Sequence, residues 1–252
     1  MNRTASFLWH EGKGVVLALA LVLVVRTVAA EPYSVPTPSM VPTLMVGDTL
    51  VATKYAYGYS RYSMPIGEIP ITGRVLDRMP ERGDVIVFRL PRDPSVTYVK
   101  RVIGLPGDRI QMKEGRLYIN GAMAARREAG TLDTVVLGRP VTLHRYIETL
   151  PATGNQAGRD HDILEMSDDD ALDNTREYTV PAGQYFMMGD NRDDSLDSRV
   201  AAAEGGVGMV SKEYLVGRAD LVLYSRDPDT AWWNPASWGE IAKHLRLFTQ
   251  IS

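Results

Sequence analysis

The chain has 252 residues, of which 44% are hydrophobic and 23% are charged, a balance typical of a folded globular protein rather than a disordered one. Its net charge of −3, without a strong basic patch, argues against nucleic acid as a partner. The absence of cysteine excludes disulfides, thiolate metal sites and a cysteine nucleophile, but it leaves the cellular compartment open.

The N-terminal region contains an uninterrupted apolar run at residues 14–25, followed by Arg26. Counted through Ala30, the segment has about 17 residues and makes about 25 Å of helix, at the short end for crossing a bilayer. Arg3 and Lys13 precede it, which favours a cytoplasmic N-terminus. The pattern predicts a membrane anchor.

A cleavable signal peptide is the alternative reading of this segment. Val28 and Ala30 are small residues at the two positions that a cleavage site needs, whereas Arg26 puts a charge where such a segment is normally neutral. We therefore favour a retained anchor, and in either case everything after Ala30 is exported. The expected organisation is a cytoplasmic N-terminus, one transmembrane helix and an extracytoplasmic catalytic domain: residues 1–13, 14–30 and 31–252.

After the anchor, short β-forming runs alternate with turns, at residues 49–53, 84–90, 97–103, 116–120, 178–180, 185–188 and 215–223. Pro106-Gly107 has the residue order of a type II turn, and Asn120-Gly121 is a hairpin signal because both residues tolerate positive φ. Residues 122–177 contain few β runs and are interpreted as an irregular insertion. The sequence predicts an all-β, mostly antiparallel domain.

Near the C-terminus, apolar residues at helical spacing predict a helix over residues 238–248. Three tryptophans in this region have two readings, core packing or an aromatic belt at a membrane surface: Trp232, Trp233 and Trp238.

Ser39 stands between two prolines, which we expect to hold the segment extended and to present the hydroxyl from the sheet edge. A serine nucleophile needs a base, and histidine is the usual one. No histidine lies in a predicted β segment beside a partner carboxylate in a recognisable motif, so a Ser-His-Asp triad is disfavoured although not excluded. The histidines are His10, His144, His161 and His244.

Lys100 is the other candidate base, because it lies inside an apolar strand. Alternation puts Lys100 on one face with Tyr98 and Val102, and Val99 and Arg101 on the other. A lysine base must be neutral, so its pKa must fall from about 10.4 by about 3 units, a shift that burial against apolar walls can supply. The alternative is a strand lysine whose amine reaches solvent.

Four sequence blocks occur behind the apolar segment, in the order SMVPTL (39–44), RGDVIVF (82–88), KRVIGLPGD (100–108) and GDNRDDSLDSR (189–199). Together they resemble the type I (leader) signal peptidases of the bacterial inner membrane. The resemblance covers most of residues 14–225 and leaves out the insertion at about 122–177.

The resemblance implies a serine endopeptidase with a Ser-Lys dyad, in which Ser39 is the nucleophile and Lys100 the general base. Thr37 matches the hydroxyl that completes the oxyanion hole with the Ser39 N–H. Ser195 matches a serine that hydrogen-bonds the lysine. Asp197 and Arg199 match a structural ion pair near the site.

The implied substrates are exported preproteins, cut after a small residue while bound as an added strand. By the same resemblance, Tyr33, Val35 and Val99 line shallow pockets for the small side chains at the first and third positions before the cut. Ser39 attacks, Lys100 takes its proton, and a lysine-activated water releases the ester. No cofactor is expected.

Two positions depart from the family pattern: Pro38 stands where glycine is common, and Asp194 where asparagine is common. Pro38 leaves the Ser39 N–H in place and favours an extended Thr37. Asp194 adds a negative charge that would raise the pKa of Lys100 unless an arginine neutralises it. The acidic run around Asp194 does not fit a calcium loop, since Arg192 occupies a ligand position and the required glycine is missing.

Several alternatives remain open. A self-cleaving repressor-type Ser-Lys protease would need a DNA-binding domain and no membrane segment, the reverse of this N-terminus. A conjugation-type maturation protease with one dedicated partner would share the fold. A membrane-tethered binding or scaffold domain would carry Ser39 and Lys100 as inert residues.

Overall fold

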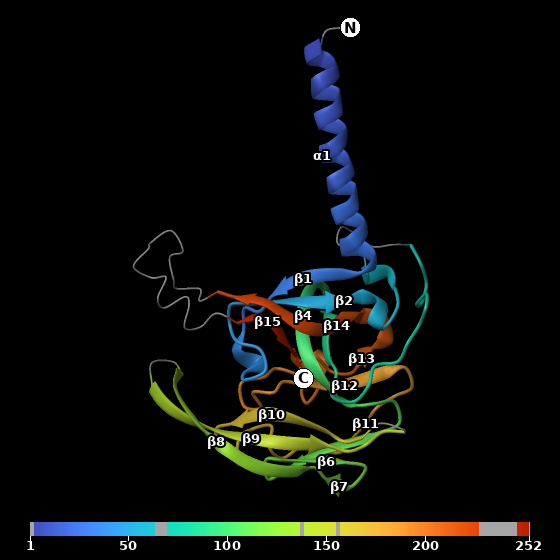
Figure 1. The fold of residues 1–252 in the computed structure, drawn as a ribbon. Coiled ribbons are helices and arrows are strands. Elements are labelled where there is room, and N and C mark those ends of the chain that lie inside the picture. Colours follow the sequence, from blue (N-terminus) through green and yellow to red (C-terminus); the bar gives the residue numbers. More distant parts are fainter. Residues whose placement is uncertain (1–2, 64–69, 137–138, 155–156, 227–245, 252) are drawn as a thin grey trace.

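The computed structural model describes residues 3–63, 70–136, 139–154, 157–226 and 246–251. It consists of one long helix, α1 (Arg3–Val28), followed by antiparallel sheets (Figure 1). The apolar side chains of α1 between Val15 and Val25 are exposed. Within the described ranges, no helix combines the length and the apolarity required of a membrane span. The mostly antiparallel β architecture is as predicted.

The main sheet has eight strands in the order β1-β2-β14-β3-β4-β12-β13, with β15 paired to β14, and all of these pairings are antiparallel. Its strands are β1 (Ala30–Ser34), β2 (Asp48–Thr53), β3 (Val85–Leu90), β4 (Asp93–Gly104), β12 (Gln184–Met188), β13 (Val210–Ser211), β14 (Leu215–Ser225) and β15 (Leu247–Gln250).

Both faces of the main sheet are buried at its centre. In β3, Val85 and Val87 belong to one hydrophobic cluster, whereas Ile86 and Phe88 belong to another. Successive side chains of a strand point to opposite faces, so a strand covered on both sides becomes a continuous apolar run. This explains why β3 was recognisable in the sequence.

A second sheet has the order β11-β5-β6-β7, formed by β5 (Arg109–Lys113), β6 (Arg116–Ile119), β7 (Ala122–Met123) and β11 (Tyr178–Thr179). The predicted hairpin turn between β6 and β7 is confirmed, since Asn120 and Gly121 have φ of 54° and 84°. Gly107, with φ of 91°, confirms the turn before β5.

The expectation of an irregular insertion is wrong. Residues 122–177 contain a three-stranded antiparallel sheet, β10-β9-β8, made of β8 (Ala125–Val136), β9 (Arg139–Leu150) and β10 (Arg159–Glu165). It lies at the end of the molecule opposite α1 (Figure 1). These strands carry ion pairs such as Arg145 with Asp162, at 2.8 Å, in place of long apolar runs. The hydrophobic pattern that identifies a strand is therefore weak here.

Short 3₁₀ turns connect the strands, at η1 (Pro38–Met40), η2 (Lys54–Ala56), η3 (Arg61–Ser63), η4 (Ala202–Glu204) and η5 (Lys212–Tyr214). The predicted C-terminal helix is wrong at its end, because Leu247–Gln250 forms β15, paired with β14. The rest of that helix, His244 and the three tryptophans lie outside the described residues.

Candidate active site

Ser39 lies in the single 3₁₀ turn η1, not in an extended segment. Thr37 before the turn is extended, with φ of −125° and ψ of 150°, and the N–H of Val41 after it closes the turn on the Pro38 carbonyl at 3.0 Å. Proline suits the first position of a helical turn because its φ is already helical and its missing N–H has no partner there. Proline also pushes the preceding residue into an extended conformation. Pro38 is thus compatible with the turn at Ser39.

Lys100 lies in β4 and faces this turn. Its Nζ donates a hydrogen bond to the Ser39 Oγ, although the two residues are 61 positions apart. Lys100 is 3% exposed, and its Nζ lies 5.6 Å from the centre of the Tyr98 ring, on the same strand face as predicted. The reading of a lysine whose amine reaches solvent is therefore wrong.

The surroundings of Lys100 lower its pKa from 10.5 to about 8. Burial is the main cause, because it disfavours the charged ammonium form. The carboxylates of Asp197 and Asp190 oppose the shift, Arg199 adds to it, and Asp194 opposes it more weakly. A substantial neutral fraction near neutral pH follows, as proton abstraction requires.

A buried carboxylate network lies behind the lysine. Ser195 Oγ donates to Asp197 Oδ2 at 2.9 Å, and Arg199 holds the same carboxylate through Nε and Nη2, each at 2.9 Å. The Asp197–Arg199 ion pair therefore exists. The predicted bond between Ser195 and Lys100 does not occur among the hydrogen bonds of the described residues, since the Ser195 hydroxyl is directed to Asp197 instead.

Thr37 lies beside the predicted nucleophile, with its Oγ1 3.5 Å from the Ser39 Oγ. This position is compatible with a donor to an oxyanion, and the role stays a prediction. Asp194 is exposed, and neither Arg192 nor Arg199 neutralises it, because Arg192 pairs with Glu148 and Arg199 with Asp197.

A groove of about 440 Å³ opens beside Ser39 and Lys100. It is lined by all three predicted pocket residues, Tyr33 and Val35 from the β1 side and Val99 from β4. The Tyr33 hydroxyl donates to Glu31 Oε2 at 2.9 Å, so the polar end of the Tyr33 side chain is bonded to Glu31. The remaining lining residues are Ser34, Pro36, Thr37, Pro38, Met40, Val96, Thr97, Tyr98, Asp194 and Leu196.

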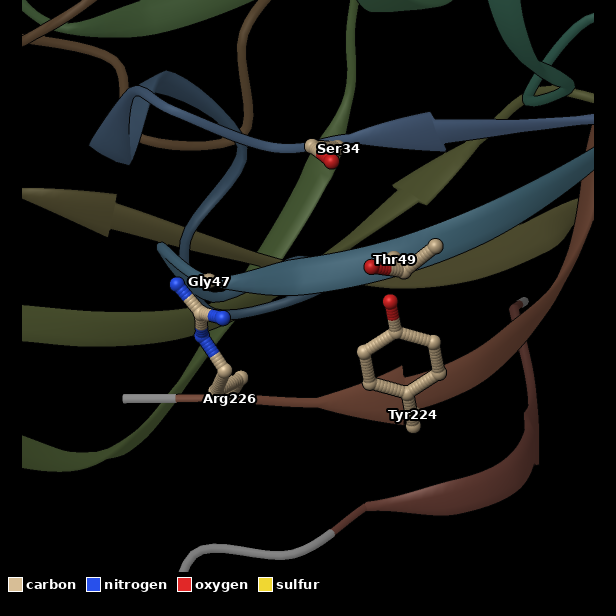
Figure 2. Close-up of a pocket in the computed structure, with 5 residues that line it drawn as sticks. All are labelled: Ser34, Gly47, Thr49, Tyr224 and Arg226. Carbon is tan, nitrogen blue, oxygen red and sulfur yellow. The ribbon is translucent and has the colours of Figure 1, made fainter. Parts of the chain in front are cut away.

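A second cavity, of about 250 Å³, lies where β1 and β14 end and β2 begins (Figure 2). The Tyr224 hydroxyl points toward Thr49 in this view, and the Arg226 guanidinium lies near Gly47 (Figure 2). Ser34 lines both this cavity and the groove. None of the residues predicted for the site by sequence lines the second cavity.

The expectation that His144 and His161 lie in an irregular segment is wrong. His144 is in β9, and His161 is in β10 with its Nε2 3.5 Å from Glu148 Oε2. Burial, together with Arg101, lowers the pKa of His161 to about 4, so its imidazole is neutral. The hydroxyl of Ser39 is nevertheless held by Lys100.

Residues 8–224 match the family model described as "Signal peptidase, peptidase S26". The chain belongs to this family. It is 39% identical to the signal peptidase I of Rickettsia typhi over 242 residues, which cover 92% of this chain and 86% of that protein. The signal peptidase I of Rickettsia prowazekii is 40% identical over 225 residues, 86% of this chain and 79% of that protein.

Among solved structures, a signal peptidase I from Enterococcus faecalis V583 covers 56% of this chain and 97% of its own, at 26% identity and a TM-score of 0.31.

Sequence reasoning missed two contacts of this signal peptidase family member, both made by Asn191 to the backbone of Pro38 and Ser39. The Asn191 N–H donates to the Ser39 carbonyl at 3.1 Å, and its Nδ2 donates to the Pro38 carbonyl at 3.3 Å. A Cβ on Gly189 would lie 2.5 Å from the same Ser39 carbonyl, so this close approach requires glycine. The only available signal was the position of both residues in the 189–199 block.

Proposed function

We propose that the chain is a membrane-bound endopeptidase that removes N-terminal signal peptides from exported preproteins. The observation that carries the proposal is the contact between Lys100 Nζ and Ser39 Oγ, buried at the end of a groove, in a member of the signal peptidase family. A buried lysine of lowered pKa beside a hydroxyl is the arrangement that activates a serine without histidine.

The reaction follows from this geometry. Neutral Lys100 takes the Ser39 proton while Ser39 Oγ bonds to the scissile carbonyl carbon, and the ammonium then returns a proton to the departing amine. An ester to Ser39 remains. Lys100 next takes a proton from water, whose oxygen attacks the ester, and Ser39 regains its proton as the signal peptide leaves.

The charge that develops on the carbonyl oxygen needs donors already in place. The Ser39 N–H is one, and the Thr37 hydroxyl, 3.5 Å from the Ser39 Oγ, is the second that we propose. Ser195 orients Asp197 rather than the lysine itself. Asp197 and Arg199 maintain the buried charge balance behind Lys100.

The groove suits an extended peptide with small side chains. Tyr33 and Val35 on one wall and Val99 on the other leave room for small residues at the first and third positions before the cut. β1 is the outermost strand of the main sheet, with one edge paired to β2. An added substrate strand is the standard way to occupy such an edge.

For the N-terminus we propose one anchor at residues 14–30, with residues 1–13 in the cytoplasm and residues 31–252 on the periplasmic side of the inner membrane. The exposed apolar side chains along α1 support this assignment, because lipid would cover them. Lys13 before the run supports the orientation. The anchor would then hold the groove close to the membrane through which precursors emerge.

The decisive test is cleavage of a purified precursor by the detergent-extracted full chain. Ser39→Ala and Lys100→Met should each abolish turnover, whereas replacing His144, His161 and His244 together by glutamine should leave it largely intact. Activity in Lys100→Met would refute the dyad. An inert wild-type chain would favour a binding or scaffold role, and cleavage of only one dedicated partner would favour a maturation protease.

A further inference from the structure

The starting point is the segment Asp190–Arg192, whose central residue holds the Ser39 carbonyl. On its opposite edge this segment pairs with β10. The Leu164 N–H donates to the Asp190 carbonyl and the Arg192 N–H donates to the Leu164 carbonyl, both at 2.8 Å, as a parallel bridge between Leu164 and Asn191. The backbone of β10 is therefore two hydrogen-bonded steps from the proposed nucleophile.

A side-chain contact fixes the same segment to β9. Arg192 donates to both carboxylate oxygens of Glu148, from Nη1 at 3.1 Å and from Nη2 at 2.5 Å. Both side chains are almost wholly buried. A forked, bidentate pair of this kind defines orientation as well as distance.

Hydrophobic packing supports the contact from the other side. Val41, two residues after Ser39, forms a buried cluster with Leu143 of β9 and Leu164 of β10. The turn that carries Ser39 thus rests on the β8–β10 sheet directly, as well as through Asn191.

Glu148 is the carboxylate that pairs with Arg192, because the other charged groups around Arg192 have partners of their own. Glu165 is held by Arg126, whose Nη1 donates to Glu165 Oε2, although burial raises the pKa of Glu165 to about 8. His161 is neutral, as described above. Asp190 is paired with Arg101, whose Nε and Nη2 donate to the two carboxylate oxygens at 2.8 Å each.

We infer that Glu148 is a positioning residue for the proposed peptidase reaction. Acting through Arg192, it holds the segment Asp190–Arg192 in register, so that the Asn191 N–H keeps Ser39 aligned with Lys100. The β8–β10 sheet is thereby a support for the active site and not an appendage. The inference rests on the proposed function for its kinetic consequence, but not for its structural one.

The test compares Glu148→Gln with a matched variant, Asp162→Asn, which removes the partly exposed ion pair to Arg145 in the same sheet. Misplacement of a reacting group by about 1 Å costs about 10²-fold in rate. Glu148→Gln should lower kcat by about 10- to 100-fold, with KM changed less than twofold. Asp162→Asn should keep the wild-type kcat, and Glu148→Asp should recover part of the loss.

Amide hydrogen exchange gives a readout that does not depend on activity. The Asn191 N–H should exchange at least tenfold faster in Glu148→Gln than in the wild type, whereas the Val87 N–H in β3 should not change. In Glu148→Gln the buried guanidinium of Arg192 has lost its carboxylate partner. The double variant Glu148→Gln/Arg192→Gln removes that charge, so it should be more stable than Glu148→Gln but should not regain kcat.

A normal kcat in folded Glu148→Gln, beside an active wild type, would overturn the inference. So would an equal acceleration of exchange at Asn191 and Val87, which would mean that Glu148 contributes only to global stability. If the wild type itself cut no precursor, the proposed function would fail, and the exchange at Asn191 alone would decide whether Glu148 positions the segment.

Discussion

Cleavage should increase with pH through a midpoint near 8, because Lys100, the base that we propose, can accept a proton only when it is neutral. The pKa of this group falls from 10.5 to about 8 on burial. A shift of that size corresponds to about 3 kcal/mol, or roughly a 300-fold larger neutral fraction at pH 7 than in an exposed lysine. Roughly a tenth of the enzyme would then be in the active form at pH 7.

The sign of the dependence follows from the proton balance. Below pH 8 the ammonium predominates and kcat/KM should fall tenfold per pH unit, and above pH 8 it should reach a plateau. The assay is kcat/KM for one fluorogenic precursor peptide between pH 5.5 and 10, at constant ionic strength. A midpoint near 6.5 would indicate a histidine base, and one above 10 would mean that Lys100 is not desolvated in solution.

The same profile measured on Asp194→Asn tests the surroundings of the lysine. Asp194 raises the pKa of Lys100, so its removal should move the midpoint to lower pH. Because Asp194 is exposed, its interaction is of the order of 0.2–1 kcal/mol, which is about 0.1–0.7 of a pH unit. A midpoint that moves to higher pH would contradict the assignment.

Two further expectations concern the oxyanion and the anchor. Thr37→Val should lower kcat by about 10²–10³ with KM little changed, and Thr37→Ser should stay active; near-normal kcat in Thr37→Val would make the hydroxyl dispensable. Mass measurement of the membrane-extracted chain should show that residues 14–30 are retained, because the Ala29 carbonyl and the backbone of Ala30 are already paired with residues at the end of β2. A soluble chain that begins at Glu31 would contradict this.

The pairing of Ser39 with Lys100 was predicted from the resemblance carried by four sequence blocks and not from a local pattern. Strand alternation gave only the face of Lys100, and its apolar strand left both a buried amine and a solvent-exposed amine open. The bend at Ser39 was not predictable from the prolines alone, since Pro38 is compatible with an extended segment and with the first position of a helical turn. Which of the two forms depends on the Asn191 contacts, which are remote in sequence.

The β8–β10 sheet was missed for a different reason. Its strands carry pairs that exist only after strands align, such as Arg145 of β9 with Asp162 of β10, and no periodicity in one strand records them. His161 was misjudged in the same way, because its burial comes from partners on other strands. A sequence pattern indicates which side chains of one segment are buried, whereas this site depends on contacts between side chains of several segments.

The Asn191 contact also sets a sequence of events during synthesis. The backbone that bears Ser39 emerges early, but the asparagine that fixes it follows 153 residues after Pro38. At about 5–20 residues per second, roughly 8–30 s separate the two. A nascent chain therefore displays its serine and its lysine well before it has the part that aligns them. The order of residues along the chain delays assembly of a working protease until Asn191 has been synthesised.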